Sequence, residues 1–322
     1  MEPLRLQLRS ALSAMLGFVP DDLVQRLRRA HRLSPPASLR HRLYSGILQV
    51  VRHRHLDAGI EFVRIDEFGL LLYNDNSVLT KRLFYFGEYE SSEAYWWKYF
   101  CQGAREVVEF GANTGFYSII GARVPGVVRY TAVEPHPRCA EVLRRNLSIN
   151  GIHQVEVIEA AVVGKAESER QELWIPLRDA DMTPTGGSLA LGQPPDGRAR
   201  EKIPVRLVEA RQYLEGADLI KMDIEGQEQY VLEAAQDILA KRRPTIFAEV
   251  LRRNVRLREY IPELCRHCGY DVFAIAEDGL HSLPPSEVPR RDHYQEFGTR
   301  DLILTVSTSV PTSSVVPKGA AP

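Results

Sequence analysis

A glycine-rich turn after a short apolar run is the segment of this sequence with the clearest capacity for chemistry. It reads Glu109-Phe110-Gly111-Ala112-Asn113-Thr114-Gly115 and leads into a helical pattern. Glycines allow backbone N–H groups to approach a ligand closely. The spacing Gly-x-x-x-Gly lacks the middle glycine of dinucleotide sites, and Glu109 would repel a pyrophosphate. We therefore expect a ligand with a positive group, such as an ammonium, near Glu109.

Two further acidic residues end the next two apolar runs. Glu134, in Val133-Glu134-Pro135, lies 23 residues after Gly111, close to the spacing of about 20 expected for a carboxylate that binds ribose hydroxyls. In Glu159-Ala160 the small residue leaves space for a flat ring, and Glu159 can accept from an exocyclic amine. These positions predict a nucleoside site formed by Glu109, Gly111, Ala112, Asn113, Gly115, Glu134, Pro135, Glu159 and Ala160.

More acidic residues gather after the fourth and fifth apolar runs. Asp223, Glu225 and Glu228 follow Leu219–Met222, and Glu249 closes the fifth run. If these strands are neighbours, they lie about 4.8 Å apart, so Asp223 and Glu249 can project into one crevice beside the nucleoside. One of two such carboxylates can serve as a base, or the pair can hold a hard cation such as Mg²⁺. Glu228 can equally be a first-turn helix acid.

The elements that must position these residues begin near Arg105. Short apolar runs alternate with helical segments, which predicts an α/β fold with a doubly wound, mostly parallel, seven-stranded sheet. The expected strands are 106–110, 127–133, 155–158, 219–222, 245–250, 272–275 and 302–306. The expected helices are 117–123, 138–150, 227–240 and 256–268. The last two strands lack a helical pattern between them and could pair as an antiparallel hairpin at the sheet edge.

The segments outside this core have other patterns. Residues 1–56 are rich in Arg and Leu and predict a helical extension docked on the core, with membrane-surface binding as the alternative. Residues 57–103 predict a β-meander over 60–86 and an aromatic helix over 93–102. The core domain is expected over 104–306, with a long loop at 177–201 that is either a functional lid or disordered. A disordered tail is expected over 307–322.

Composition limits the classes of function. The 322 residues carry 41 basic and 42 acidic side chains, which gives no electrostatic case for nucleic acid. Four cysteines cannot form a disulfide framework. We read no signal peptide at the N-terminus and no apolar run long enough for a membrane span. These features predict a soluble, cytoplasmic protein.

Three other features carry less weight. The pair Cys265 and Cys268 has C-x-x-C spacing, but it ends a helix and has no second pair for zinc. The run His53-Arg54-His55 is more typical of a solvated basic turn than of a metal cluster. Lys221 alternates with Asp223 and is interpreted as structural rather than catalytic.

The run from about residue 87 to residue 250 resembles the FkbM family of S-adenosylmethionine-dependent methyltransferases. The block Ile220 to Glu228 is the most family-specific piece, although Met222 replaces a more usual β-branched residue. Glu109 stands where the family more often has Asp, which keeps the charge. The other matching segments are Gly87-Glu88-Tyr89-Glu90, Glu109 to Ser118, Val133-Glu134-Pro135, Asn146 to Gly151, Gly187-Ser188-Leu189, and Arg243-Pro244 leading to Glu249.

The resemblance implies a Rossmann-like class I methyltransferase fold and S-adenosylmethionine as cofactor. It implies in-line methyl transfer to a hydroxyl of a small-molecule acceptor, a sugar or another natural product. Asp223, which also adjoins the cofactor, is the first choice of base and Glu249 the next. A metal held by both acids could instead lower the pKa of the hydroxyl. Tyr89, Ser188 and Glu225 are the expected acceptor contacts, with the loop at 186–188 covering the acceptor.

Two other readings stay open. One is a non-catalytic protein that keeps the methyltransferase fold and binds a partner through its N-terminal helices. The other is a nicotinamide-dependent oxidoreductase, which the missing middle glycine and Glu109 disfavour. Binding of S-adenosylhomocysteine without binding of NAD would favour the methyltransferase. The oligomeric state is left undetermined by the sequence.

Overall fold

The structure, a computed structural model, describes residues 21–32, 38–51, 60–65, 69–87, 89–176 and 200–306. These residues form two compact units, and the chain passes from the first unit to the second between Tyr89 and Glu90. The expected tail from residue 307 and most of the expected loop at 177–201, Ser188 included, lie outside the described residues. No helix within the described ranges is long and apolar enough to cross a membrane.

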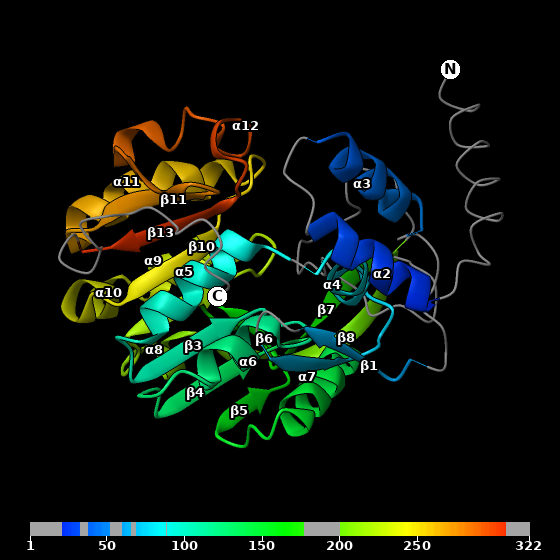
Figure 1. The fold of residues 1–322 in the computed structure, drawn as a ribbon. Coiled ribbons are helices and arrows are strands. Elements are labelled where there is room, and N and C mark those ends of the chain that lie inside the picture. Colours follow the sequence, from blue (N-terminus) through cyan, green and yellow to red (C-terminus); the bar gives the residue numbers. More distant parts are fainter. Residues whose placement is uncertain are drawn as a thin grey trace. The chain divides into compact units, whose positions relative to one another are not determined.

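The first unit combines helices with a short hairpin (Figure 1). Its elements are α2 (Asp21–Arg32), α3 (Leu39–Val51), β1 (Phe62–Ile65), β2 (Leu70–Tyr73) and α4 (Val78–Phe86). The two strands pair antiparallel, with Phe62 opposite Tyr73 and Ile65 opposite Leu70. Val63, Ile65, Leu70 and Leu72 are buried, so one face of the hairpin supplies apolar surface to this unit.

The β-meander expected over residues 60–86 is wrong beyond this hairpin, because the remainder folds as α4. Ser77 Oγ accepts from the Thr80 N–H at 3.1 Å, and Asp75 Oδ1 accepts from the Ser77 N–H at 3.0 Å. Gly87, with a φ of 81°, ends the helix. These caps form hydrogen bonds with backbone groups that a helix leaves without partners at its ends. Their stabilisation of the helix outweighs the apolar–polar alternation that predicted strands here.

The second unit is built on an eight-stranded sheet in the order β12-β11-β13-β10-β9-β3-β4-β5. From β10 to β5 each neighbouring pair runs parallel. The predicted doubly wound, mostly parallel sheet is therefore confirmed. Its strands are β3 (Glu106–Phe110), β4 (Arg129–Val133), β5 (Val155–Ile158), β9 (Leu219–Met222), β10 (Thr245–Glu249), β11 (Asp271–Ala276), β12 (Gly279–Leu283) and β13 (Asp301–Thr305).

The C-terminal part of this sheet differs from the prediction in two details. The last two predicted strands do pair antiparallel, with Asp271 opposite Thr305, but they do not form a hairpin at the edge. Strand β13 inserts between β10 and β11, and β12 occupies the edge, which raises the strand number from seven to eight. The Pro- and charge-rich composition of residues 279–299 hid this short edge strand.

Helices complete the layers of the second unit. They are α5 (Ser91–Cys101), α6 (Phe116–Ala122), α7 (Pro137–Ile149), α8 (Arg211–Leu214), α9 (Glu228–Ala234), α10 (Gln236–Arg242), α11 (Val255–Cys268) and α12 (His293–Phe297), with a 3-10 turn at Pro285–Glu287. The single helix expected over 227–240 is divided at Ala235 into α9 and α10.

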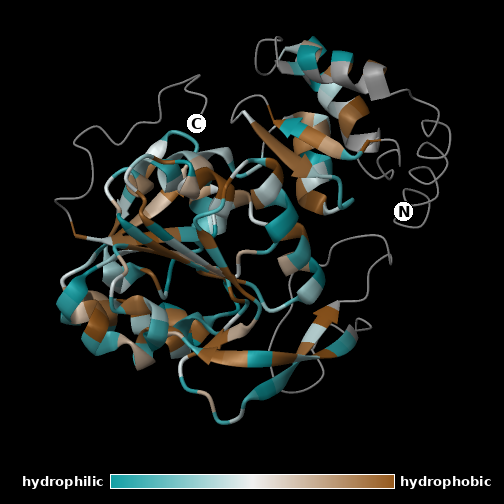
Figure 2. Ribbon diagram, turned by 90° about the horizontal axis from the view of Figure 1, so that it is seen from below, coloured by the Kyte–Doolittle hydropathy of each residue, from teal (hydrophilic) through white to brown (hydrophobic). Residues whose placement is uncertain are grey.

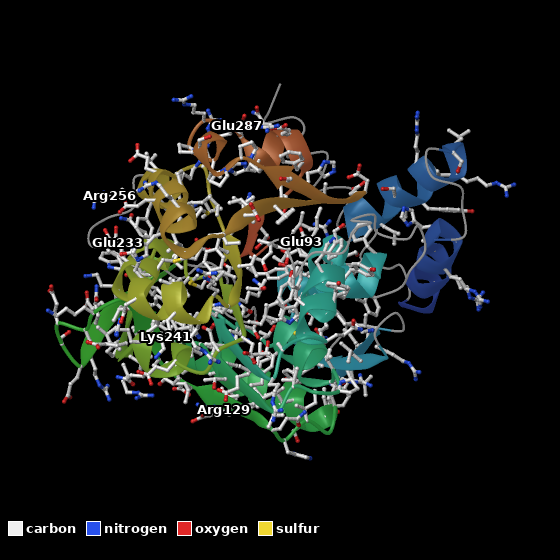
Figure 3. All side chains as sticks on the ribbon, turned by 90° about the vertical axis from the view of Figure 1, so that its left-hand side faces the viewer. Glu93, Arg129, Glu233, Lys241, Arg256 and Glu287 are labelled. Atoms are coloured by element: carbon white, nitrogen blue, oxygen red, sulfur yellow. The ribbon has the colours of Figure 1, made fainter. Side chains whose placement is uncertain are left out.

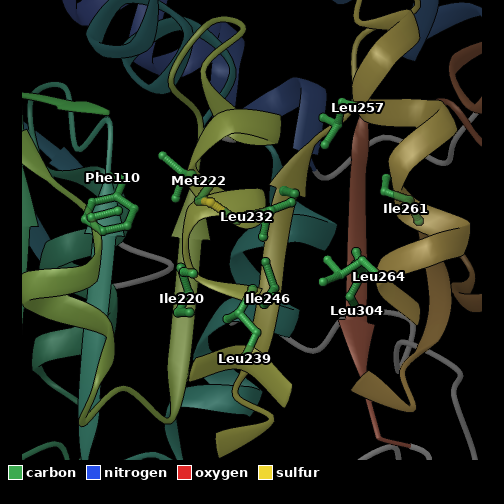
Figure 4. Close-up of a cluster of buried hydrophobic side chains, with 14 of the residues drawn as sticks. Phe110, Ile220, Met222, Leu232, Leu239, Ile246, Leu257, Ile261, Leu264 and Leu304 are labelled. Atoms are coloured by element: carbon green, nitrogen blue, oxygen red, sulfur yellow. The ribbon is translucent and has the colours of Figure 1, made fainter. Parts of the chain in front are cut away.

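The main hydrophobic core lies between the sheet and helices α9 to α11. Figure 4 shows its strand side chains facing its helix side chains. Figure 2 shows hydrophobic colouring along the central strands, as expected for strands covered on both faces. The labelled residues of Figure 4 are Phe110, Ile220, Met222, Ile246 and Leu304 on strands, and Leu232, Leu239, Leu257, Ile261 and Leu264 on helices.

The aromatic helix predicted over 93–102 is α5, which packs on the other face of β10. The ring of Trp97 meets that of Phe247 edge-on at 5.3 Å between centroids, and Phe100 lies 5.6 Å from Phe247. Trp97 Nε1 also donates to the Tyr117 carbonyl at 3.0 Å. Because successive strand residues point to opposite faces, Phe247 packs against α5 while Ile246 packs in the main core.

A second, three-stranded sheet was not predicted. It has the order β6-β8-β7 and consists of β6 (Ala161–Val163), β7 (Arg170–Pro176) and β8 (Arg200–Glu209). Strands β7 and β8 pair antiparallel from Arg170 opposite Arg206 to Pro176 opposite Arg200. Charged residues on the exposed face of this sheet obscured the alternation of apolar and polar residues along its strands. Its small hydrophobic core consists of Ala161, Val163, Leu173, Ile175 and Val205.

Candidate functional site

The glycine turn joins β3 to α6 at the carboxyl end of the parallel strands. The Gly111 and Ala112 N–H groups donate to the Val133 carbonyl at 2.9 and 3.1 Å, which ties the turn to β4. Gly111 has a φ of 82°, and a Cβ there would lie 1.9 Å from the Asp223 carbonyl oxygen. Gly115 has a φ of 88°, and its Cβ would lie 2.2 Å from Leu143 Cδ1. Gly111 is thus required by the close approach of the Asp223 backbone, whereas Gly115 is required mainly by its left-handed φ.

Glu134 is held against this turn at the end of β4. Its Oε2 accepts from the Asn113 N–H at 2.8 Å and its Oε1 accepts from the His136 N–H at 2.9 Å. The side chain is buried, and this burial raises the pKa of Glu134 to about 7 although both N–H groups favour the ionised form. A carboxylate oxygen can accept more than one hydrogen bond, so Glu134 keeps acceptor capacity for two hydroxyls.

The other predicted nucleoside contacts lie around the same strand ends. Ala112 and Ala160 are buried, and Pro135 is half-buried between β4 and α7. Glu159 is exposed and pairs with Arg144 at 3.0 Å. The small and acidic side chains at the end of β5 therefore lie beside the Glu134 strand, as the parallel register of β4 and β5 requires.

Glu109 occupies a different environment from the other predicted cofactor residues. Its side chain is almost completely buried, and its Oε2 accepts from Ser118 Oγ at 2.6 Å and from the Tyr130 hydroxyl at 2.5 Å. Burial raises the pKa of this carboxyl, while the two hydroxyl donors and Lys221 act in the opposite direction. Glu109 thus anchors α6 and β4 beneath the turn, and a direct contact with a ligand ammonium stays a prediction.

Asp223, Glu225 and Glu249 form a cluster of carboxylates at the ends of β9 and β10. One carboxylate oxygen of each residue lies within 4.8 Å of one oxygen of the others. Ala248 pairs with Met222 in the parallel register, so Asp223 and Glu249 leave their strands side by side. Glu225 follows in the β9–α9 turn with a φ of 51°. The two predicted catalytic acids are therefore brought together with Glu225, which was predicted as an acceptor contact.

Proton affinity differs strongly within this cluster. Burial raises the pKa of Glu249 to about 10, and the negative charge of Asp223 adds to the effect. Among the described residues, Glu249 Oε2 is buried without a hydrogen-bond partner. Glu249 is consequently protonated at neutral pH, which reduces repulsion in the cluster. Burial also raises the pKa of Glu225, and the Arg253 guanidinium, 2.6 Å away, opposes that rise.

Glu228 has a structural role in the same loop. It is buried, and its carboxylate accepts from the Ile224 N–H at 3.0 Å and from the Gly226 N–H at 2.9 Å. Asn254 Nδ2 approaches the same carboxylate at 3.3 Å. Glu228 is the first residue of α9, which agrees with its interpretation as a first-turn acid. Its hydrogen bonds also hold the loop that carries Asp223 and Glu225.

The buried cation Lys221 and acids from distant parts of the chain complete the electrostatic environment of the site. Lys221 Nζ lies 4.4 Å above the centre of the Tyr117 ring. Burial lowers the pKa of Lys221, but the surrounding carboxylates, Asp223 and Asp301 foremost, raise it above its ordinary value. The Tyr117 hydroxyl donates to Glu90 Oε2 at 2.7 Å. Sequence reasoning treated Lys221 as structural and did not include Glu90 or Asp301, which reach the site from distant parts of the chain.

The remaining predicted acceptor contacts are not joined to this cluster by the structure. Tyr89 is half-buried and belongs to the first unit, whereas the acidic cluster belongs to the second. Ser188 lies outside the described residues. Both stay predictions. Figure 3 shows the surroundings: the labelled Glu93 lies toward the interior, while Arg129, Lys241 and Arg256 lie at the periphery.

The fold is that of a Rossmann-like α/β protein, and its candidate site residues meet at the carboxyl ends of parallel strands. Residues 109–272, more than half of the chain, match the family model described as the methyltransferase FkbM domain. The chain belongs to the FkbM family of methyltransferases, and its fold is the Rossmann-like class I methyltransferase fold. No curated protein sequence matches it.

Three solved structures similar to this chain are distant from it in sequence. Cofactor-bound Rv0187 from MTB is 17% identical over 68% of this chain and 81% of its own, with a TM-score of 0.39. Methyltransferase FkbM from Methylobacillus flagellatus KT is 16% identical over 82% of this chain and 60% of its own, with a TM-score of 0.38. TYW2 from M. jannaschii, in complex with AdoMet, is 14% identical over 77% of this chain and 86% of its own, with a TM-score of 0.41.

Substituting alanine for Gly111 tests the close packing of the turn. Gly151 is the matched control, because its φ of 69° is also left-handed but nothing lies within 4 Å of its Cβ position. We expect Gly151→Ala to cost about 1–2 kcal/mol of unfolding free energy from backbone strain. Gly111→Ala should cost roughly 1–3 kcal/mol more from overlap with the Asp223 carbonyl. Equal losses in urea titrations followed by circular dichroism would contradict this account.

The raised pKa of Glu249 predicts a pH-dependent stability. The unfolded chain releases this proton near its ordinary pKa of 4.5, whereas the folded chain holds it up to about 10. Folding therefore becomes less favourable as pH rises between these values. Glu249→Gln should be more stable than wild type at pH 8, by about 1 kcal/mol or more, with a smaller gain at pH 5. Urea midpoints would measure both.

The control for this comparison is Glu259→Gln, which removes an exposed carboxyl on α11. Its midpoints should run parallel to those of wild type from pH 5 to pH 8. If the Glu249→Gln curve also runs parallel to wild type, Glu249 does not retain its proton in the folded protein.

Proposed function

We propose that this protein is an S-adenosylmethionine-dependent methyltransferase that methylates a hydroxyl of a small-molecule acceptor, a sugar or another natural product. One observation carries the proposal: Glu134, bonded to the glycine turn, and the acidic cluster lie at the same edge of the sheet, on either side of the β3 end. All of these residues fall within the part of the chain that matches the family. The acceptor class and a cytoplasmic location rest on the sequence.

The residues at the β3–β5 edge fit a nucleoside cofactor. Glu134 offers its remaining acceptor capacity to a ribose diol, next to the Asn113 backbone that it already binds. The buried Ala112 and Ala160 add no bulk beside it, and Glu159 is exposed for an exocyclic amine. S-adenosylmethionine supplies, when bound, a methyl group on an excellent sulfonium leaving group. The protein must then align the acceptor oxygen with that methyl group.

Asp223 is the base in this proposal. The acceptor hydroxyl has a high pKa, so its proton must leave as the new bond forms, and a positioned carboxylate can take it. Glu249 is protonated at neutral pH and can instead donate a hydrogen bond, which separates the roles of the two acids. The positive charge of Lys221 offsets the negative charge of Asp223 before Asp223 takes the proton.

A divalent cation at this cluster is the less favoured arrangement. The three carboxylates have the spacing and the hard oxygen donors that such an ion requires. The proposal needs no such ion, because a positioned Asp223 carboxylate can take the hydroxyl proton by itself. We therefore place base catalysis by Asp223 first and assign no step to a metal.

The acceptor is proposed to lie over the acidic cluster. Glu225 borders this region and is oriented by Arg253, so it can bind an acceptor hydroxyl without moving. Tyr89 and Ser188, with the loop at 186–188 as a cover, complete the proposed acceptor contacts. The non-catalytic alternative predicts neither cofactor-dependent transfer nor an effect of Asp223 on it.

Replacement of Asp223 by Asn tests the role of the base. Asp223→Asn should bind S-adenosylhomocysteine in calorimetry as wild type does, while methyl transfer falls by about 10²–10⁴-fold. Transfer is measured by mass spectrometry after incubating the protein with methyl-labelled cofactor and an extract of the source organism. The control is Glu233→Gln, an exposed acid on α9 labelled in Figure 3. Full transfer by Asp223→Asn would remove Asp223 from the mechanism.

The pKa of Glu134 predicts how cofactor binding depends on pH. This carboxyl has a pKa of about 7, and only its ionised form accepts freely from a diol. The affinity for S-adenosylhomocysteine should therefore rise between pH 6 and pH 8. Glu134→Gln should bind more weakly and lose this dependence, while Glu156→Gln, an exposed change on β5, should keep it. An affinity of the wild type that is constant over this range would count against a Glu134–ribose contact.

A further inference from the structure

A cavity of about 360 Å³ adjoins the acidic cluster and takes no part in the chemistry described above. Its wall is formed by residues 250–253 after β10, Arg258 of α11, residues 291–295 around α12, and Arg300 before β13. Figure 1 shows α12 at the β11–β13 end of the sheet. The volume lies in the range of small-ligand sites, which span roughly 300–1,000 Å³.

The wall of the cavity is strongly basic. Five of its residues are arginines, and its one carboxylate is Asp292. The arginines are Arg252, Arg253, Arg258, Arg291 and Arg300. A guanidinium presents several N–H donors in a planar fork that matches carboxylate and phosphate oxygens. Basic lining of this density indicates an anionic ligand rather than a neutral one.

Three of the arginines are already committed to the fold. Arg258 donates to the Val288 carbonyl at 3.1 Å and to the Arg291 carbonyl at 2.5 Å. Arg291 pairs with Glu287 at 2.8 Å and with Glu296. Arg253 donates to Glu225 at 2.6 Å. These contacts fix the wall and connect it to the acidic cluster.

Arg252 and Arg300 keep donor capacity for a ligand. Arg252 lies 3.3 Å from Asp292, and its side chain is 79% exposed. Arg300 lies 3.8 Å from Glu249 Oε1, beyond hydrogen-bond distance, and its side chain is 55% exposed. The Arg300 guanidinium also lies 5.2 Å from the centre of the Tyr294 ring. Arg300 is therefore placed between the cavity and the catalytic acids.

His293 gives an independent indication of a ligand. It lines the cavity and is 3% exposed; the Val288 carbonyl acts on its ring as a backbone hydrogen-bond partner, and its ring nitrogens make no side-chain hydrogen bond among the described residues. The Val288 carbonyl can satisfy only one of the two ring nitrogens, and a buried polar atom without a partner is unfavourable, so such an atom normally has one. Burial and the neighbouring Arg258 lower the pKa of His293, whereas an anion beside the second nitrogen would favour its protonation, so that both ring nitrogens donate.

We propose that this cavity binds an oxyanion group, a carboxylate or a phosphate, carried by the methyl acceptor, with Arg300, Arg252 and His293 as its ligands. The proposal rests on the proposed methyltransferase function for the identity of the ligand as the acceptor. It narrows the acceptor to a hydroxylated acid or a phosphorylated sugar-like molecule. The oxyanion would be held in the cavity while the hydroxyl faces Asp223 and Glu249 at the adjoining strand ends.

The experiment titrates the full chain with inorganic phosphate and, separately, with sodium acetate at constant ionic strength. Calorimetry gives the dissociation constants, and thermal unfolding reports on stabilisation. We expect saturable binding of at least one anion, and the tighter one distinguishes a phosphate from a carboxylate. Arg300→Gln and His293→Leu should each weaken that binding about tenfold or more, the loss expected for one charge-assisted or buried hydrogen bond.

Arg129→Gln is the matched control, since Arg129 is an exposed arginine of the same unit, 60% exposed and 3.4 Å from Glu106. It should bind the anions as wild type does. His293→Leu removes the ring and its contact with the Val288 carbonyl, so a purely structural histidine predicts unchanged anion binding in a protein that still unfolds cooperatively. Absence of saturable binding, or equal weakening in all three variants, would overturn the proposal.

Titration of the same variants with S-adenosylhomocysteine separates this proposal from the proposed function. Arg300→Gln and His293→Leu should bind the nucleoside as wild type does. Nucleoside binding without any anion effect would refute the oxyanion site and leave the methyltransferase proposal intact. Anion binding that depends on Arg300 and His293 supports the site even where the nucleoside fails to bind.

Discussion

The balance of charge around Lys221 is the constraint on which the rest of the site depends. Carboxylates from four separate parts of the chain surround this buried ammonium: Asp223 and Asp301 at strand ends, Glu90 before α5, and Glu109 within β3. One buried cation cannot neutralise so many acids, and the excess is relieved where Glu249 retains its proton. Removing water from these groups is unfavourable unless charges pair or protonate, so the positions of the acids and the cation are mutually dependent.

The parallel sheet explains why these charges meet at one edge. The strands β10, β9, β3 and β4 run in one direction. The acidic cluster, the glycine turn and Glu134 follow their carboxyl ends and therefore lie side by side. The turn cannot move independently, since Gly111 lies against the Asp223 carbonyl and Asn113 is bonded to Glu134. The proposed cofactor site and the proposed acceptor site therefore share one frame, as positioning of two reactants requires.

Much of this edge was predictable because the relevant signals are local. The glycine spacing, Glu134 and the acids after Leu219–Met222 each follow a strand within a few residues, and parallel pairing then places them together. The helix α4 and the sheet formed by β7 and β8 were missed. The short hydrophobic patterns of these segments fit more than one type of secondary structure. Capping by Ser77 decides that α4 is a helix. Pairing of β7 with β8, which lie on either side of residues 177–199, decides that these two segments are strands. Strand β13 was predicted, but its insertion beside β10 depends on pairing over more than 50 residues.

The sequence by itself determined the fold class, the family resemblance and the main candidate residues, because periodicity and strand-end motifs are properties of neighbouring residues. Only the tertiary structure decided which of those residues share an environment. It placed Glu109 beneath the turn, made Glu228 a loop clamp, and brought Lys221, Glu90 and Asp301 together. It also placed the buried His293 and the exposed Arg300 in the wall of one cavity. Burial and long-range charge are sums over the whole fold, so no local pattern could have contained them.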